Sequence, residues 1–307
     1  MESLSVVLAL MTQDNDYQQA QAAAAGEVAS RAGIKLEVVY ADNDAVNQTQ
    51  QLIRIIQDKE RRPSGILVSP VGTDMPQVAK AAVAAGIGWG VLNRSPQYVS
   101  ELRRSARVPV FAVTTDQEAV GKIQAKQIAA LVKEGNVLYI EGPSSSAAAK
   151  VRTEQAMRNK PATVELKMIR GDWTQHGAQQ AVRSWLSLST SRQLQVRAVI
   201  CQNDAMALGA RNALTDIVEK DHKKWMTIPF TGCDGLERTG QEWVRRGLLT
   251  ATIVIPRSAG LALEIMSRAL RGSSAPPAAT LTDPVSYPTI EELATSGSTI
   301  GEETHAH

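Results

Sequence analysis

The feature that most constrains the fold is an alternation of short apolar runs with longer amphipathic segments, repeated along almost the whole chain. Such alternation is typical of βαβ units, which build a parallel sheet with helices packed on its faces. The first unit has a strand at 5–11 and a helix at 18–32, and a second strand follows at 34–40. The predicted fold class is therefore α/β with parallel sheets.

The alternation restarts once, near Asp116. A polar stretch at 95–107 interrupts it, and a helix predicted over 118–133 begins a second series of strands and helices. With 307 residues the chain is long enough for two lobes of ordinary size. Prolines predict an extended, non-helical ending before a solvated tail at 301–307; they are Pro276, Pro277, Pro284 and Pro288.

Composition argues against several classes of protein. The chain has 33 basic and 31 acidic residues, a net charge of +2 and no long run of like charge, so no nucleic acid or membrane-surface partner is expected. No segment approaches the roughly 20 apolar residues that span a bilayer. The run 4–11 is too short for the core of a signal peptide, and Glu2 stands where such a peptide carries positive charge. Two interpretations stay open: an export signal has been removed, or the protein stays in the cytoplasm.

Cofactor and metal motifs are absent from the sequence. It contains no phosphate-cradling glycine motif and no HExxH, and its four histidines do not have a metal-ligand spacing. Cys201 and Cys233 stand on predicted buried strands, where free thiols are expected. Neither a cofactor nor a metal is therefore expected.

Two strand ends carry polar residues in the second half of the chain. The apolar run 198–201 breaks at Gln202-Asn203-Asp204, and one of the last two residues is expected to cap the helix that follows. About thirty residues later the run that starts at Ile228 ends at Asp234 and Gly235. Open α/β sheets bind ligands beyond the carboxyl ends of their strands, so a ligand crevice is predicted there.

The polar residues at the predicted strand ends, taken in order along the chain, resemble those of the periplasmic sugar-binding proteins of the ribose/galactose type. These proteins share their fold with the effector domains of lactose-repressor-type regulators. The resemblance covers nearly the whole chain. Its most specific parts are 202–210 (QNDAMALGA) and 232–235 (GCDG), with 250–253 (TATI) after them.

The resemblance implies two Rossmann-like lobes of the periplasmic-binding-protein type I, joined by three hinge crossovers near 115/116, 255 and 283. The N-terminal lobe would be 1–115 plus 256–282, and the C-terminal lobe 116–255 plus 283–307. It further implies a periplasmic or other extracytoplasmic monomer that binds a monosaccharide or polyol between the lobes. Hinge closure would deliver this ligand to the membrane subunits of an ABC transporter.

The implied ligand-binding residues supply the chemistry that a sugar requires. Carboxylates, amides and guanidinium groups suit the hydroxyls on its edge, and aromatic rings suit its C–H faces. Asn93-Arg94 match the family's strand-end Asp-Arg pair, and Trp173 stands where the family often has an aromatic residue over the sugar ring. The full implied set is Asp14, Tyr17, Asn93, Arg94, Asp116, Arg152, Trp173, Asn203 and Asp234.

A structural role is an alternative for each of these residues. Asn203 is favoured for ligand contact and Asp204 for capping. Asp234 could instead cap a helix or turn, Arg152 could be an exposed surface arginine, and Tyr17 could staple the first helix. Capping explains the three aspartates that precede helices as well as ligand contact does; they are Asp14, Asp16 and Asp116.

Two departures from the family pattern put the ligand's identity in doubt. Asn93 replaces the family's Asp, and Ile255 stands where many members have a ligand-contacting Gln, so a nucleoside or a furanone also stays open. A ligand-sensing module with the same fold is an alternative function. A sugar-processing enzyme is less favoured, because amides and arginines resemble recognition groups more than a matched acid and base.

Overall fold

The computed structural model describes residues 4–72, 75–192, 194–216, 225, 227–272 and 275–295. The chain forms two compact units. The N-terminal unit comprises Met1–Thr115 and Pro256–Thr282, and the C-terminal unit comprises Asp116–Ile255 and Asp283–His307. The chain therefore passes between the units three times. The predicted tail at 301–307 lies outside the described residues.

The N-terminal unit contains a six-stranded parallel sheet with the order β11-β5-β4-β3-β1-β2. Its strands are β1 (Ser5–Leu10), β2 (Lys35–Tyr40), β3 (Gly65–Val68), β4 (Gly88–Leu92), β5 (Val110–Thr115) and β11 (Ala279–Thr282). Its helices are α1 (Asp16–Ala32), α2 (Ala45–Gln57), α3 (Pro76–Ala84), α4 (Gln97–Arg103) and α12 (Ser258–Leu270).

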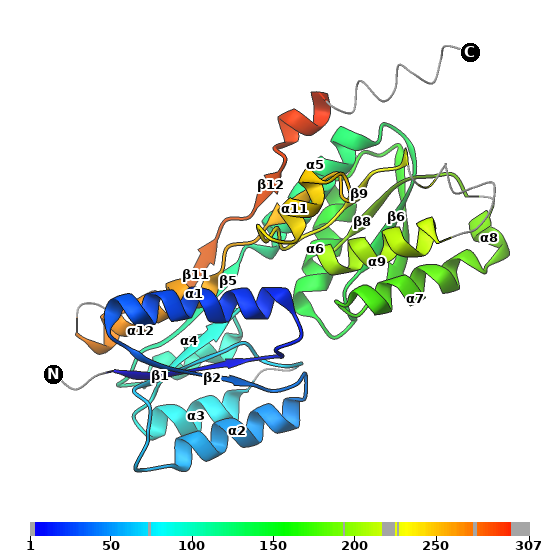
Figure 1. Cartoon of the computed structure of the whole chain (residues 1–307). Helices are drawn as coiled ribbons and strands as arrows, with labels where there is room; N and C mark the ends of the chain where they lie inside the picture. Colours follow the sequence, from blue (N-terminus) through cyan, green and yellow to red (C-terminus); the bar gives the residue numbers. More distant parts are fainter. Residues whose placement is uncertain are drawn as a thin grey trace, which may run out of the picture. The chain divides into compact units, whose positions relative to one another are not determined.

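Helices cover both faces of this sheet. One apolar core joins α1 and α12 to one face, and a second core joins α2, α3 and α4 to the other, as Figure 1 shows. Strands buried on both faces are expected to be apolar throughout, which is what β3 and β4 are. Helix α12 lies so close to the sheet that a Cβ at Gly88 would come within 2.7 Å of the Met266 sulfur.

The C-terminal unit contains a four-stranded parallel sheet, β7-β6-β8-β9, and an antiparallel pair, β10-β12. Its strands are β6 (Gly135–Glu141), β7 (Val164–Arg170), β8 (Val196–Cys201), β9 (Phe230–Thr231), β10 (Thr252–Val254) and β12 (Val285–Tyr287). Its helices are α5 (Gln117–Leu131), α6 (Ala147–Asn159), α7 (Gln175–Leu186), α8 (Ser189–Arg192), α9 (Asp204–Thr215) and α11 (Gly240–Arg245).

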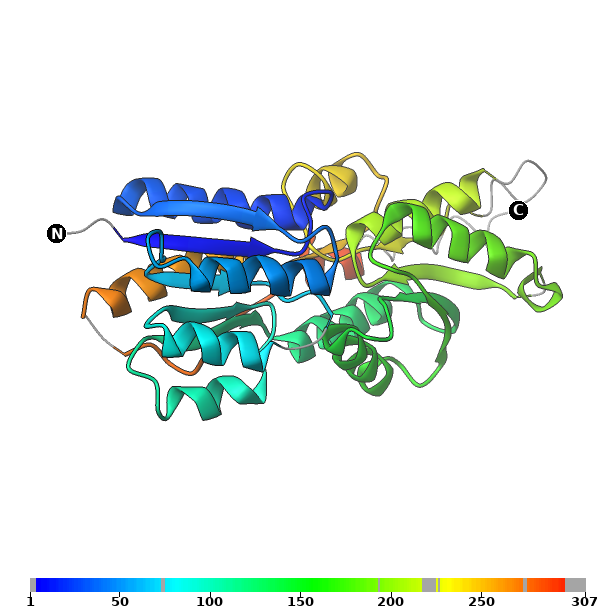
Figure 2. The ribbon, with the colours of Figure 1, turned by 90° about the horizontal axis from the view of Figure 1, so that it is seen from below.

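The two faces of this second sheet are also covered. Helices α7 and α9 pack side by side on one face, visible in Figures 1 and 2, and α5 and α6 pack on the other. The contact of α7 with α9 is close, since a Cβ at Gly209 would lie 2.0 Å from the Gln175 carbonyl oxygen.

The predicted fold class is confirmed: helices flank parallel sheets in two lobes. One local prediction is wrong, because the polar stretch at 95–107 contains helix α4. Val99, which is 1% exposed, is the buried residue of this helix. Because the helix has only seven residues, its sequence shows no clear helical repeat of apolar positions. The ending is extended at 279–287 as predicted, and its residues form β11 and β12. The prediction of a wholly non-helical ending is wrong, because residues 290–295, after the last of the four prolines, are helical. Both cysteines are free and buried, also as predicted.

No helix among the described residues has the length and apolar character needed to cross a membrane.

Candidate functional site

The N-terminal unit has a cluster of neutral polar side chains at the carboxyl end of β4. Asn93 follows that strand with a left-handed φ of 63°. Its Oδ1 accepts hydrogen bonds from the Ser258 hydroxyl at 3.1 Å, from the Tyr17 hydroxyl at 3.4 Å and from Gln21 Nε2 at 3.5 Å. Its Nδ2 donates to the Ser69 hydroxyl at 3.1 Å. We call these five residues the Asn93 cluster.

Gln21 and Ser258 are members that sequence reasoning missed. Gln21 is fully buried; its Nε2 also donates to the Ser258 hydroxyl at 3.3 Å, and its Oε1 accepts from the Ala259 amide at 2.8 Å. These bonds join α1 to the first turn of α12. A signal for Gln21 exists in the sequence, because it follows Tyr17 by four residues and so lies on the same helix face.

The other N-terminal candidates lie outside this cluster. The Arg94 guanidinium donates to the carbonyl oxygens of Gly72 at 2.8 Å and Pro70 at 3.2 Å, so it holds the connection between β3 and α3. Asp14 is exposed. The alternative role of Asp14 as the α1 cap is wrong, because Asn15 accepts from the Gln18 amide at that position.

Arg152 is the centre of a second polar cluster, in the C-terminal unit. It lies on α6 and is only 6% exposed, so the alternative of an exposed surface arginine is wrong. Its Nε donates to Gln117 Oε1 at 2.7 Å, and its Nη1 donates to the Gln202 carbonyl at 2.7 Å and to Cys233 Sγ at 3.7 Å. The guanidinium carbon lies 5.8 Å from the centroid of the Trp173 ring, within the range of a cation–π contact.

Trp173 follows β7 with an unusual backbone conformation. Its φ is 73°, a value that bulky side chains rarely adopt. The carbonyl of Trp173 accepts from Asn203 Nδ2 at 2.9 Å, and its ring lies against Gly142, where a Cβ would come within 2.2 Å of the indole. Contacts on both the backbone and the ring therefore hold this partly buried tryptophan in place.

Asn203, rather than Asp204, caps helix α9. Its Oδ1 accepts from the Met206 amide at 2.8 Å. The assignment of capping to Asp204 is therefore wrong. Because both polar atoms of Asn203 already bond within the chain, a role in ligand contact would add to its capping role.

Asp204 is instead a buried carboxylate beside the loop 232–235. It is 3% exposed; Oδ2 accepts from the Gly235 amide at 2.8 Å and Oδ1 accepts from the Thr252 hydroxyl at 2.6 Å. Burial raises the pKa of Asp204 to about 6, against the opposing effect of these two hydrogen bonds. Burial likewise raises the pKa of the Cys233 thiol to about 12, although Arg152 lowers it, so this thiol is neutral at pH 7.

Asp234 lies in the same loop with a φ of 125°. Its amide donates to the Ile253 carbonyl at 2.9 Å, and its own carbonyl accepts from the Ile255 amide at 3.0 Å. It is not the cap of α11, whose N-cap is Thr239. Asp116 does act as a cap, since its Oδ1 accepts from the Ala119 amide at the start of α5.

Gln202 is a further buried residue whose role the sequence did not reveal. It is fully buried; its Oε1 accepts from the Gly142 amide at 2.9 Å and its Nε2 donates to the Thr153 hydroxyl at 2.9 Å and the Tyr139 hydroxyl at 3.0 Å. It joins the ends of β6 and β8 to α6. The end of β8 is thereby fixed relative to the end of β6 and to α6, the helix that carries Arg152.

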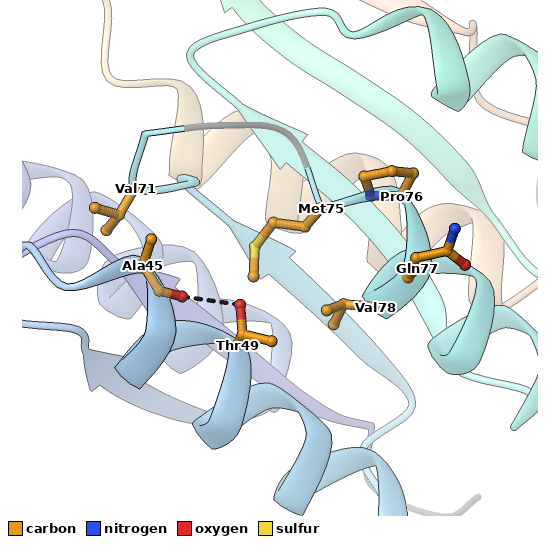
Figure 3. A pocket seen from close by; sticks show the side chains of 7 residues that line it. All are labelled: Ala45, Thr49, Val71, Met75, Pro76, Gln77 and Val78. Atoms are coloured by element: carbon orange, nitrogen blue, oxygen red, sulfur yellow. Dashed lines mark hydrogen bonds between the residues drawn. The ribbon is translucent and has the colours of Figure 1, made fainter. Parts of the chain in front are cut away.

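A small apolar pocket lies away from these candidates. Figure 3 shows it in the N-terminal unit, where α2, α3 and the β3–α3 connection meet. Its volume is about 210 Å³, and its lining is Ala45, Thr49, Val71, Met75, Pro76, Gln77 and Val78. None of the nine candidate residues lines it. Within the described ranges, no group of three or more acidic, histidine or cysteine side chains is arranged to hold a metal ion.

Comparison with known proteins gives a consistent result. A family model described as periplasmic binding protein domain matches residues 6–274. A putative rhizopine-binding protein of Rhizobium meliloti is 30% identical over 59% of this chain, and the match spans 58% of that relative, less than two thirds of its length. The ribose import binding protein of Salmonella typhimurium is 25% identical over 87% of this chain and 85% of its own.

A solved structure shares the fold over nearly the whole chain. It is an ABC transporter periplasmic solute binding protein from Actinobacillus succinogenes with bound D-allose. It covers 95% of this chain and 100% of its own, with a TM-score of 0.80 and 20% sequence identity.

Proposed function

Because this chain belongs to the periplasmic binding protein domain family, we propose that it binds a small polyhydroxylated solute, a monosaccharide or a polyol, and releases it unchanged. One relative is named a putative rhizopine-binding protein, another is named a ribose import binding protein, and a structural neighbour holds D-allose. These ligands share a ring or chain whose edge carries hydroxyl groups, the chemistry that the candidate side chains suit.

The observation that carries this proposal is the position of backbone strain. Five described non-glycine residues have positive φ, and three of them are Asn93, Trp173 and Asp234. Such conformations cost on the order of 1–3 kcal/mol each and gather at ligand sites, where surrounding contacts maintain them. All three follow the carboxyl ends of strands, the edge at which open α/β sheets bind ligands.

The side chains supply complementary roles for a sugar. The Asp234 carboxylate would accept from hydroxyls, the Arg152 guanidinium would donate to oxygen atoms, and the Trp173 ring would contact a C–H face. Asp14, Tyr17, Asn93 and Arg94 would act from the N-terminal unit, and Asp116 and Asn203 from the C-terminal unit. Hydrogen bonds to charged groups contribute about 1.5–3 kcal/mol each, so a few suffice for the roughly −8 kcal/mol of a micromolar complex after ordering costs.

Transport would follow from closure of the two units on the ligand. The chain passes between the units three times, and a ligand that contacts both units would shift the population towards a closed form. The membrane subunits of an ABC importer would recognise that form. The protein would then work as a monomer outside the cytoplasmic membrane.

A thermal-shift screen followed by calorimetry tests the function. The probes are D-ribose, D-allose, xylitol and myo-inositol, and the nucleoside adenosine represents the alternative ligand class. We expect one carbohydrate or polyol to raise the melting temperature and to bind one-to-one, and chromatography to recover it intact. Binding of adenosine alone would contradict the ligand class, and consumption of a probe would indicate an enzyme.

Asp234→Asn is the matched variant for this test. Asn tolerates positive φ nearly as well as Asp does, so the loop conformation should be retained while the charge is lost. We expect affinity for the bound probe to fall about tenfold or more, with the melting temperature of the ligand-free protein nearly unchanged. Equal affinity in the variant would remove Asp234 from the site.

A further inference from the structure

We propose that Asp204 is a positioning residue that holds Asp234 in its strained backbone conformation, so that the loop 232–235 is ready to bind ligand before ligand arrives. The positioning of ligand rests on the proposed function, whereas the local restraint on the loop does not.

Asp204 bonds to both peptide groups that flank Asp234. Its amide donates to the Cys233 carbonyl at 2.7 Å, and its Oδ2 accepts from the Gly235 amide at 2.8 Å. Because each peptide group is planar, fixing the two planes on either side of a residue also fixes the φ and ψ angles between them. The φ of 125° at Asp234 is thus enforced from one neighbouring residue.

The same carboxylate joins the loop to β10. Its Oδ1 accepts from the Thr252 hydroxyl at 2.6 Å, and Asp234 exchanges two backbone hydrogen bonds with Ile253 and Ile255. The loop therefore lies between the first residue of α9 and an anchored strand. A rotation at Asp234 would break bonds on both sides.

Two glycines make room for this arrangement. A Cβ at Gly232 would come within 2.1 Å of Asp204 Oδ1, and a Cβ at Gly240 within 2.0 Å of Oδ2. The motif Gly232-Cys-Asp-Gly235 and the acid at 204 are therefore one structural unit, although about thirty residues separate them. This explains in physical terms why the two motifs occur together in this chain.

Packing alone would not require a hydrogen-bonding side chain here. Burying a charge is unfavourable, and apolar residues of similar volume often stabilise such positions equally well. The charged or titratable groups near Asp204 are the thiols of Cys201 and Cys233, the Arg152 guanidinium beside Cys233, and Asp234. What the carboxylate provides is a pair of acceptors aimed at the Gly235 amide and the Thr252 hydroxyl.

Three variants separate this role from general stability. Asp204→Ala removes both acceptors. Asp204→Asn retains both bonds, because its oxygen accepts from Gly235 and its amide group donates to the Thr252 oxygen. Leu214→Ala is the control: this residue is fully buried on the same helix and is not part of the candidate site, so it lowers stability without touching the loop.

Amide hydrogen exchange on the ligand-free protein is the first measurement. We expect exchange at Gly235 to accelerate about tenfold or more in Asp204→Ala, relative to the amide of Val199 in β8. In Asp204→Asn and in Leu214→Ala the ratio of the two rates should stay near that of the original protein. An unchanged ratio in Asp204→Ala, or an equal acceleration in Asp204→Asn, would overturn the restraint.

Calorimetry with the four carbohydrate and polyol probes is the second measurement. We expect Asp204→Ala to weaken binding of the bound probe about tenfold, Asp204→Asn to restore it, and Leu214→Ala to leave it unchanged. Combining Asp204→Ala with Asp234→Asn should cost little more than Asp234→Asn alone, because the first residue acts through the second. Full additivity would refute positioning. If the original protein binds no probe, the proposed function and the positioning role both fail, while the exchange result still decides the local restraint.

Discussion

The polar clusters at the strand ends of the two units differ in charge. The Asn93 cluster of the N-terminal unit consists of amides and hydroxyls. The C-terminal unit instead buries the guanidinium of Arg152 and the carboxylate of Asp204. A neutral cluster loses about 1 kcal/mol for each missing hydrogen bond, whereas loss of a buried charged partner costs more. The C-terminal cluster should therefore be the more rigid and the more sensitive to substitution and pH.

The two clusters share one structural feature. Each contains a hydrogen bond to a residue close to Ile255 and Pro256, where the chain passes from one unit to the other. Thr252 donates to Asp204 on one side of this passage. Ser258 donates to Asn93 on the other side. A residue proposed to position the ligand loop, Asp204, and one proposed to contact ligand, Asn93, are therefore bonded to the two flanks of one of the three passages.

The largest expected effect is that of Arg152→Ala. The substitution leaves the Gln202 carbonyl and Gln117 Oε1 without their donor and removes the cation from the Trp173 ring. We expect the free energy of unfolding to fall by about 2–4 kcal/mol. Urea titration followed by tryptophan fluorescence measures it, since four of the five tryptophans belong to the C-terminal unit.

Asn93→Ala is the matched variant in the other unit. It removes two hydrogen bonds of 3.1 Å and two weak ones of 3.4 and 3.5 Å, so it should cost less, about 1–2 kcal/mol. Trp89, the N-terminal unit's tryptophan, is fully buried and reports on that unit when the other four are replaced by Phe. Equal losses for the two variants would show that charge does not distinguish the clusters.

The second effect is a pH dependence of stability that arises from Asp204 in the C-terminal unit. Burial raises the pKa of Asp204 from 3.8 to about 6, so the folded protein binds a proton that the unfolded chain releases. The free energy of unfolding therefore increases as the pH falls from about 6 towards 4, and decreases as the pH rises through the same range.

Thermal unfolding at pH 4.5 and pH 7.5 tests this dependence against Asp204→Asn, which has no titratable group at that position. The difference between the two proteins in unfolding free energy should change by on the order of 2 kcal/mol between these pH values. Using the difference removes the contribution of exposed carboxylates such as Glu165, whose pKa Lys167 lowers. A constant difference would indicate that Asp204 titrates in its ordinary range.

The fold was predictable because its signal is local and repeated. Each strand of a doubly covered parallel sheet is apolar by itself, so residues 65–68 predict β3 without any knowledge of its neighbours. Helix α4 was missed because seven residues provide too few turns for a period to emerge. The predicted positions of Asn93, Trp173 and Asp234 beyond strand ends follow from the same local signal.

The partners of these residues could not be predicted in the same way. Gln21 bonds to Ser258, which lies 237 positions later, and no sequence pattern records such a contact. The choice between Asn203 and Asp204 as the cap depended on the Gly235 amide and the Thr252 hydroxyl, which draw Asp204 into the interior. Local propensity treats the two residues as equivalent caps, and tertiary contacts decided between them.

Asn93→Asp is expected to change the free energy of unfolding less than Arg152→Ala or the titration of Asp204 does. One carboxylate oxygen would keep the three donors that Asn93 Oδ1 now has, and the Ser69 hydroxyl would turn to donate to the other. We expect the unfolding free energy to change by less than about 1 kcal/mol, because hydroxyl groups adapt their donor direction. Calorimetry on the probe panel should show stronger binding of ligands with two adjacent hydroxyls, which a carboxylate accepts as a pair. A large loss of stability would mean that the neutral cluster depends on the Asn93 amide donor.

Tyr17→Phe should have the smallest effect on stability and so separates the two roles of the Asn93 cluster. The bond from the Tyr17 hydroxyl to Asn93 is 3.4 Å long, and the side chain is partly buried, so its loss should cost no more than about 0.5 kcal/mol. If the hydroxyl also contacts ligand, affinity for the bound probe should fall about two- to tenfold while the melting temperature of the ligand-free protein stays constant. Calorimetry and thermal unfolding of the same preparation measure both quantities. Unchanged affinity would restrict Tyr17 to a structural role and reduce the ligand contacts of the N-terminal unit to Asp14, Asn93 and Arg94.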